Sequence, residues 1–210
     1  MLPLKNAFKW LCTQRKNASP NSDIWDLRLN INSLLPEIER QISAGTYTLS
    51  PVKRITINHK RTSLWTSKDS LVLKTITLIL QKKLAPHLSP KCSHLKGNGG
   101  AKKSVRECHK NLHHPFVMRS DVKSYYASID HHILFNQFCD LVKEPYLRRI
   151  VWQYLKRTVD INGNYVSIEK GISLGCPLSP LMAALYLKPL DDALAKLNVF
   201  YLTVSNQFKR

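Results

Sequence analysis

The sequence is short of acidic residues, with 14 Asp and Glu against 32 Lys and Arg, which leaves a formal net charge of +18. A positive excess of this size is typical of proteins that bind a polyanion, and nucleic acid is the first candidate. Between Arg40 and Arg106 there are 14 basic residues and one acid, Asp69. Carboxylates return later, around Asp121 and Asp130. This layout predicts a basic binding surface followed by carboxylate chemistry, as in an enzyme that acts on phosphodiesters.

Three further absences narrow the class of protein. The five cysteines have no paired spacing, which argues against a disulfide framework and favours reduced thiols in a cytosolic protein. No apolar run approaches the roughly 18 residues of a membrane span. Residues 1–11 lack the long apolar core of a signal peptide. We therefore expect a cytoplasmic protein that contacts no membrane.

The chain is long enough for one substantial domain or two small ones, with 210 residues of which 43% are hydrophobic. Apolar residues at helical spacing predict helices over residues 69–84, 101–112, 133–141, 145–157 and 179–197. The second of these helices should carry Ala101, Val105, Cys108 and Leu112 at helical spacing. Residues 46–57 alternate loosely and include Pro51, so we expect an extended segment at the edge of a sheet.

A β-hairpin is expected over residues 158–168. Asn162 and Gly163 lie between two β-branched runs and supply the positive φ angles that a type I′ turn requires. After the hairpin, residues 171–180 form a loop that leads into the last predicted helix. Ser179 can cap this helix, and Pro180 suits its first position.

A short buried strand is expected at residues 115–118, because this run is apolar and β-favouring. The strand would carry Asp121 to its end, where a carboxylate can reach solvent and a ligand. Mg²⁺ prefers carboxylate oxygens and usually brings substrate phosphates with it, so Asp121 is a candidate metal ligand. Taken alone, Asp121 could instead cap the strand end or form a salt bridge. Asp130 is better interpreted as the cap of a helix that begins at His131.

Two motifs resemble those of reverse transcriptases. Residues 121–130 (Asp-Val-Lys-Ser-Tyr-Tyr-Ala-Ser-Ile-Asp) are similar to the first catalytic palm motif, an Asp followed by an aliphatic residue and an aromatic pair. Residues 174–182 (Leu-Gly-Cys-Pro-Leu-Ser-Pro-Leu-Met) resemble the later Gly-x-Pro-x-Ser-Pro motif, and a hairpin separates the two. The resemblance covers residues 34–201 and is strongest to the bacterial group II intron and retron-type enzymes.

The resemblance implies an α+β fold of the right-hand polymerase type, with helical fingers, an incomplete palm on a small antiparallel sheet, and no thumb. Residues 1–33 would be an N-terminal extension, 34–114 the basic fingers, 115–201 a partial palm and 202–210 a divergent tail. The implied activity is RNA-directed DNA synthesis, in which deoxynucleotides are added to a primer 3′-hydroxyl by two-metal catalysis. Its implied partners are an RNA template and primer, deoxynucleoside triphosphates and Mg²⁺, in the cytoplasm of a bacterium.

The same resemblance assigns roles in catalysis and sugar recognition. Asp121 and the backbone carbonyl of Val122 would bind the metal ions. Tyr126 matches the aromatic residue that packs under the incoming sugar and excludes a 2′-hydroxyl, which implies deoxynucleotides. Its neighbour Tyr125 is expected to have a packing role.

Four more residues are implied as substrate contacts. Gly175 and Cys176 lie in the loop that lets template and nucleotide approach the backbone closely. Arg61 and Lys68, from the basic fingers, would contact the triphosphate.

Two departures from the family pattern affect this assignment. Leu174 stands where the family usually has a glutamine, which removes a polar contact to the nucleotide. After Tyr201 the sequence continues to Arg210 without the aromatic-x-Asp-Asp segment that supplies the remaining metal ligands. Asp191 and Asp192 would not substitute, because adjacent helical residues point about 100° apart. A solvated helix face is expected for both.

We therefore expect a reading frame that is truncated or frameshifted near Leu202 and encodes a remnant with little or no polymerase activity. A non-catalytic module that binds structured RNA through the basic fingers is the alternative. No zinc site is expected, because Cys92, His94, Cys108 and His109 offer only fragments of the two paired spacings that structural zinc needs.

Overall fold

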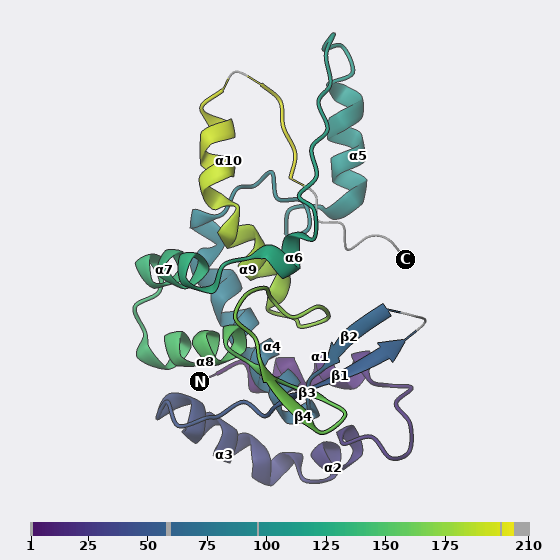
Figure 1. The fold of residues 1–210 in the computed structure, drawn as a ribbon, viewed down its shortest axis with the longest axis vertical. Helices are drawn as coiled ribbons and strands as arrows, with labels where there is room; N and C mark the ends of the chain where they lie inside the picture. The colour runs from purple at the N-terminus through teal and green to yellow at the C-terminus, as the bar shows by residue number, and fades with distance from the viewer. Residues whose placement is uncertain (1, 58–59, 96, 198, 204–210) are drawn as a thin grey trace.

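The computed structural model describes residues 2–57, 60–95, 97–197 and 199–203. Helices predominate, and a small sheet lies in the lower half of the molecule as drawn in Figure 1. The elements in chain order are α1 Leu4–Gln14, α2 Ile24–Leu29, α3 Ile31–Ser43, β1 Val52–Ile57, β2 Lys60–Leu64, α4 Ser67–Leu84, the 3₁₀ turn η1 Ala85–His87, α5 Gly100–Lys110, α6 Tyr125–Ser128, α7 His131–Leu141, α8 Pro145–Leu155, β3 Thr158–Ile161, β4 Asn164–Ser167, α9 Ser179–Tyr186 and α10 Lys188–Ala195.

The sheet has the strand order β2-β1-β3-β4. β1 pairs antiparallel with β2 and parallel with β3, where Val52 lies opposite Val159. The prediction of an edge strand is therefore wrong, because β1 has a neighbour on both sides. Pro51 is compatible with this interior place since it precedes the strand and removes no N–H from the ladder.

The predicted hairpin is confirmed as β3 and β4, with Ile161 opposite Asn164. Asn162 and Gly163 connect the strands with φ angles of +53° and +89°, the signs that a type I′ turn demands. The turn chemistry is encoded within two residues, so the register of this hairpin depends on local sequence alone.

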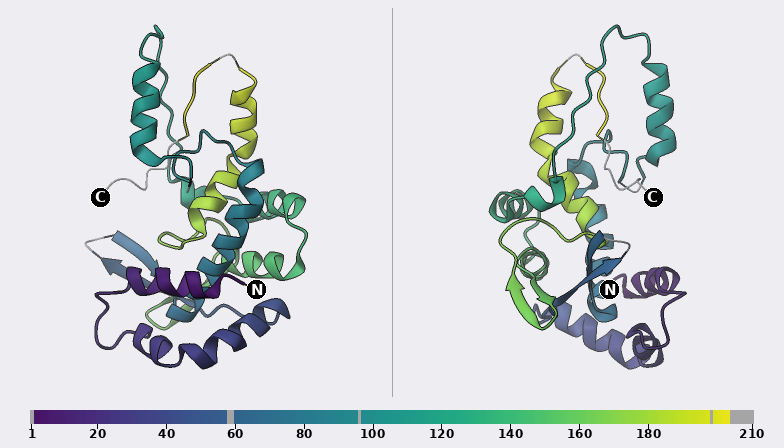
Figure 2. Two further views of the ribbon diagram at one scale, coloured as in Figure 1. Left: turned by 180° about the vertical axis from the view of Figure 1, so that it is seen from behind. Right: turned by 45° about the vertical axis from the view of Figure 1, so that its right-hand side comes forward.

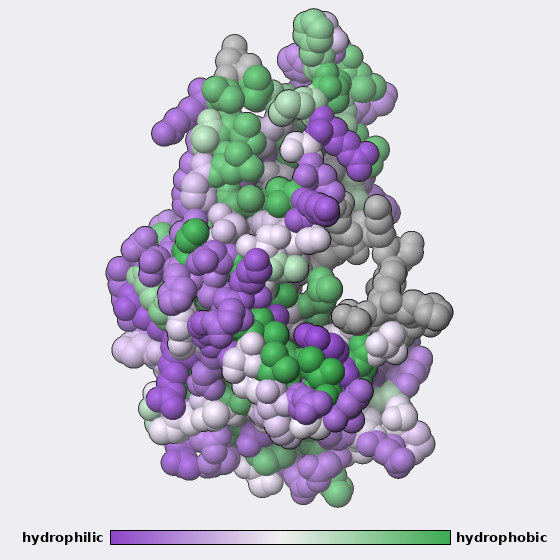
Figure 3. Space-filling view, in the orientation of Figure 1, coloured by the Kyte–Doolittle hydropathy of each residue, from purple (hydrophilic) through white to green (hydrophobic). Residues whose placement is uncertain are grey.

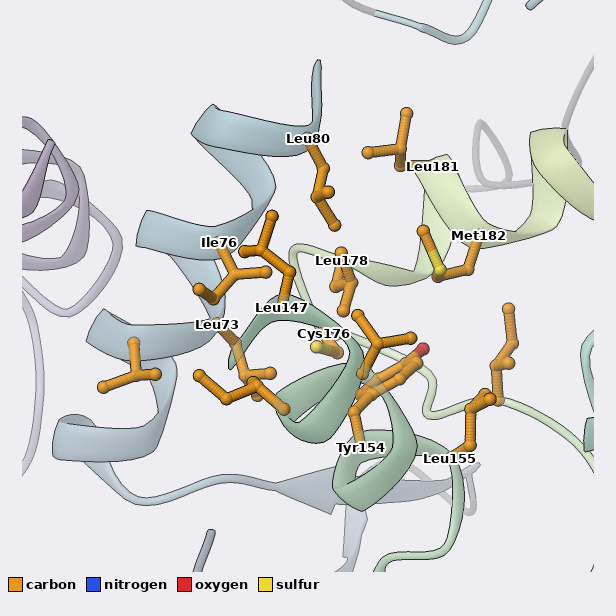
Figure 4. Packing of buried hydrophobic residues seen from close by; sticks show 14 of the residues in the cluster. Leu73, Ile76, Leu80, Leu147, Tyr154, Leu155, Cys176, Leu178, Leu181 and Met182 are labelled. Atoms are coloured by element: carbon orange, nitrogen blue, oxygen red, sulfur yellow. The ribbon is translucent and has the colours of Figure 1, made fainter. Parts of the chain in front are cut away.

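Helix α4 runs through the middle of the hydrophobic core. Its Leu73, Ile76 and Leu80 side chains point toward side chains of α8 and of the α9 region, as Figure 4 shows. The helix predicted over residues 145–157 is confirmed as α8, which buries Ile150 and Tyr154. In the part of the chain that the structure describes, no helix is long and apolar enough to cross a membrane.

The helix predicted over residues 179–197 is two helices, α9 and α10, which meet at Leu187. Pro189 explains the break, because a proline lacks the N–H of the helical ladder and clashes with the carbonyl four residues earlier. The predicted cap is also wrong: Ser179 is the first residue of α9 and Leu178 is its N-cap. The Ser179 hydroxyl is instead 2.6 Å from the Tyr154 hydroxyl in the core.

Helices α5 and α10 project from the upper end of the body, as the two views of Figure 2 show. The helix predicted over residues 101–112 is present as α5 and ends at Lys110, and Ser104 is its one buried residue. Val105 and Leu112 are each 69% exposed. The hydropathy surface in Figure 3 correspondingly has apolar colour over α5 and α10 at this end.

Candidate functional site

Asp121 lies in the segment between α5 and α6, which forms neither helix nor strand. The buried strand predicted over residues 115–118 is wrong: Phe116, Val117 and Met118 are 90%, 86% and 88% exposed. A strand forms only beside a hydrogen-bonded neighbour, and no strand of the described residues pairs with this segment. Asp121 is exposed and Val122 is 49% exposed, so both stand at the surface.

The two tyrosines that follow differ in their surroundings. The Tyr125 hydroxyl donates to the Ala183 carbonyl of α9 over 2.6 Å, which confirms the packing role predicted for it. Tyr126 is half-buried, and its ring lies edge-on to Tyr125 with 5.9 Å between centroids. The first motif is thereby fixed to α9 through Tyr125.

The first motif lies beside the segment that leads into the second motif. The Gly171 N–H donates to the Ile129 carbonyl over 2.7 Å, and the Ile172 N–H donates to the Tyr126 carbonyl over 2.8 Å. Asp130 and Lys170 form an antiparallel bridge next to them. These backbone contacts hold the start of the 171–180 loop against the end of the first motif.

Glycine is required at position 171, where the 171–180 loop crosses the end of the first motif. The sequence did not single out Gly171 as a site residue. Its φ is +85°, and a Cβ there would lie 2.9 Å from the Ala127 carbonyl oxygen and 3.0 Å from the Ala127 Cα. Any side chain would therefore combine a left-handed backbone with a collision against rigid backbone atoms. The signal in the sequence was a glycine at the start of a loop, which is too common to be specific.

Two basic side chains converge on the Gly171 carbonyl. His131 Nε2 lies 2.8 Å from this oxygen, and Arg157 Nη1 donates to it over 3.0 Å. Because a carbonyl only accepts, His131 must carry a proton on Nε2. Burial lowers the pKa of both His131 and Arg157. We call these two contacts of His131 and Arg157 with the Gly171 carbonyl the clamp. The clamp joins residues that are far apart in the sequence, so no local sequence pattern indicates it.

The free energy of unfolding is expected to fall as the pH drops from 7.5 to 5.5. Burial holds the pKa of folded His131 and His94 below the ordinary 6.5, so the unfolded chain takes up protons first. The loss should begin as the pH passes 6.5 and end below the lowered pKa values. Urea melts at several pH values measure it, and His131→Gln should flatten the profile. A stability that rises on acidification would contradict this assignment.

The second motif presents its backbone and not its thiol. Gly175 is exposed with a φ of +81°, and a Cβ there would lie 3.8 Å from Thr62 Oγ1 of β2. Cys176 is only 3% exposed, and burial raises the pKa of its thiol to about 12. A ligand contact from Cys176 would therefore use its backbone.

Of the two predicted triphosphate contacts, the structure describes the side chain of Lys68 but not that of Arg61. Lys68 is half-buried at the start of α4, with its ammonium 5.7 Å from the centroid of the Tyr47 ring. Arg61 belongs to β2 and pairs with Thr56, and its side chain lies outside what the structure describes.

Asp191 departs most from expectation, because it is 2% exposed and not on a solvated face. Thr203 Oγ1 donates to its carboxylate over 2.7 Å, and Cys92 Sγ donates over 3.2 Å. Asp192 is exposed and pairs with Lys188, as predicted for a surface residue. Asp191 therefore ties α10 to the loop around Cys92 and to residues 201–203.

The described residues do not assemble the ligands of a metal ion. Across residues 2–57, 60–95, 97–197 and 199–203, no three His, Cys, Asp or Glu side chains are close enough together to hold one. Asp121 is a single exposed carboxylate, whereas Mg²⁺ sites need near-octahedral oxygen geometry. The described residues thus do not fit a complete Mg²⁺ site.

Comparison with known proteins finds a matching family and several similar proteins. The sequence model of the family Reverse transcriptase (RNA-dependent DNA polymerase) matches residues 58–203. The group II intron-encoded protein LtrA of Lactococcus lactis subsp. cremoris is 25% identical over 179 residues, covering 79% of this chain and 29% of that protein. The COX1/OXI3 intron 2 protein of Saccharomyces cerevisiae is 21% identical over 196 residues, covering 90% of this chain and 23% of that protein.

Solved structures share the fold. A chain of the partial Cas6-RT-Cas1–Cas2 complex superposes with a TM-score of 0.55 at 15% identity, covering 97% of this chain and 37% of that one. The chain thus spans less than a third of the length of the curated relatives it matches.

Proposed function

Because this chain belongs to the reverse transcriptase family, we propose that it binds an RNA template and primer and contributes part of a site for deoxynucleotide addition. The observation that carries this proposal is the backbone pairing of Gly171 and Ile172 with the end of the first motif. That pairing holds the first family motif beside the start of the loop that leads into the second. In the proposal, residues 34–114 are the fingers and residues 115–201 a partial palm, between a 1–33 extension and a 202–210 tail.

The proposed roles follow the family motifs. Asp121 and the Val122 carbonyl are offered as metal ligands, and Tyr126 as the residue that packs under the deoxyribose. Gly175 and Cys176 would let template and nucleotide approach the backbone. Arg61 and Lys68 would contact the triphosphate, and the clamp on Gly171 would keep the two motifs in register.

We do not expect these 210 residues to extend a primer by themselves. Phosphoryl transfer by metal ions needs the ions held to within about 0.5 Å by several ligands, and Asp121 is one carboxylate. The second candidate function is therefore a non-catalytic RNA-binding module. The net charge of +18 favours it, since RNA binding needs cations and no metal.

Binding of a labelled structured RNA tests the shared part of both functions. Each neutralised phosphate gives a slope of about −0.7 to −0.9 in log K against log salt. Contacts to about five phosphates predict a slope of about −3.5 to −4.5, and roughly a 100- to 500-fold loss of affinity between about 50 and 200 mM salt. Absent or salt-insensitive binding would contradict RNA binding by this chain.

Primer extension with Mg²⁺ separates the two functions. No product is expected from the 210-residue protein, because its metal site is incomplete. A matched Asp121→Ala protein is the control for contaminating polymerase. Extension by the parent that disappears in Asp121→Ala would overturn the non-catalytic reading and favour the polymerase.

A further inference from the structure

Helix α5 turns its small polar side toward the rest of the molecule. At about 100° per residue, Gly100, Ser104, Glu107 and Asn111 share one face. Ser104 is buried and the other three are half-buried, so this is the inner face. An amphipathic helix normally buries its apolar side, and α5 does not.

The apolar side of α5 forms a narrow exposed stripe. Its members on α5 are Ala101, Val105 and Cys108, at intervals of four and three residues, and Leu112 continues this spacing in the turn that follows the helix. All four are exposed, and the three large side chains that follow along the chain, at residues 116–118, are also exposed and do not cover them. A one-residue-wide stripe with this spacing suits the contact between two packed helices, whereas a membrane-binding face is broader.

One flank of the stripe is uniformly basic. Lys102, Arg106 and His109 follow the stripe around the helix on the side away from Ser104. Within the described residues none of the three forms an ion pair, whereas Glu107 lies 3.4 Å from the Lys110 ammonium. The opposite flank carries Ser104 and Asn111, and Glu107 lies as far round the helix on that side as Arg106 does on the basic side.

We propose that this stripe docks an amphipathic helix of a protein partner, one with an apolar seam and carboxylates along the edge that meets Lys102 and His109. Charge complementarity selects this occupant. A second copy in antiparallel register would set the basic flank against itself, which costs stability. RNA would neutralise the cations but leave the apolar seam in water.

The probe is a pair of synthetic helices of about 21 residues with the same leucine seam, one with Glu and one with Lys at the flanking positions. Fluorescence anisotropy measures their binding to the 210-residue protein. The Glu helix is expected to bind at least about tenfold more tightly than the Lys helix. Val105→Glu should weaken it by about tenfold or more, whereas Leu29→Glu on α2, where the side chain is 84% exposed, should have no effect.

A charge swap keeps the proposal testable if Val105→Glu alters the fold. The double variant Lys102→Glu, Arg106→Glu should reverse the preference toward the Lys helix. Equal affinity for both helices, or an unchanged preference in the double variant, would overturn the proposal. If the parent sedimented as a dimer and Val105→Glu made it a monomer, the proposal would be overturned in favour of a second copy. If RNA displaced the Glu helix, the proposal would be overturned in favour of RNA.

Discussion

A Gly171→Ala protein is expected to melt about 8–16 °C below the parent, which corresponds to about 4 kcal/mol at about 2–4 °C per kcal/mol for a chain of this size. A left-handed φ costs an alanine about 1–2 kcal/mol. The larger part is steric, because the new Cβ would lie 2.9–3.0 Å from backbone atoms of Ala127 and Tyr126. Relief requires the two motif segments to move apart, at a cost of about 1–3 kcal/mol.

Gly163→Ala is the matched control. Gly163 has nearly the same φ, +89°, but nothing lies within 4 Å of a Cβ built there. It should therefore lose only the backbone preference, about 1–2 kcal/mol, or about 2–8 °C. Thermal melts followed by circular dichroism compare the pair. Equal shifts for both variants would mean that the crossing at Gly171 is not tightly packed.

Asp191→Ala is expected to lower the free energy of unfolding by about 3 kcal/mol, because one buried and one half-buried donor lose their acceptor at about 1–3 kcal/mol each. These donors are the Thr203 hydroxyl and the Cys92 thiol, whose pKa is itself raised, first by burial and then by the bond to Asp191. Amide hydrogen exchange at Ser93 and Thr203 should accelerate, since their backbone bridge lies beside the lost carboxylate.

Asp192→Ala provides the comparison on the adjacent residue. Asp192 is exposed and pairs with Lys188 one helical turn away, a contact worth about 0.3–0.5 kcal/mol. Its melting temperature should stay within about 2 °C of the parent. If both aspartate variants behaved alike, Asp191 would not anchor the 201–203 segment.

The sequence predicted best those features whose determining interactions are between residues close together in the chain. The β3–β4 hairpin needs only Asn162 and Gly163 in the right place, and α8 needs only apolar residues at helical spacing. Asp130 caps α7 as predicted, accepting from the N–H groups of His132 and Ile133 over 2.8 and 2.9 Å. Each of these features depends on residues within about ten positions of one another.

Features that depend on distant partners were not predictable in the same way. Residues 115–118 have the composition of a strand, but composition does not supply a neighbouring strand. Asp191 looked solvated in a helical pattern, yet its partners Cys92 and Thr203 come from other segments. In the candidate site the two motifs were recognisable, whereas the clamp of His131 and Arg157 on Gly171 was not, because three separate segments build it.

The parallel pairing of β1 with β3 has a consequence for synthesis of the chain. Val52 and Val159 are neighbours in the sheet although more than 100 residues separate them. At about 5–20 residues per second, β1 leaves the ribosome roughly 5–20 s before its partner strand exists. During that interval one edge of β1 is open to any other strand. Translation speed and chaperone access should therefore influence the yield of native protein more than they do for chains whose sheets form from consecutive hairpins.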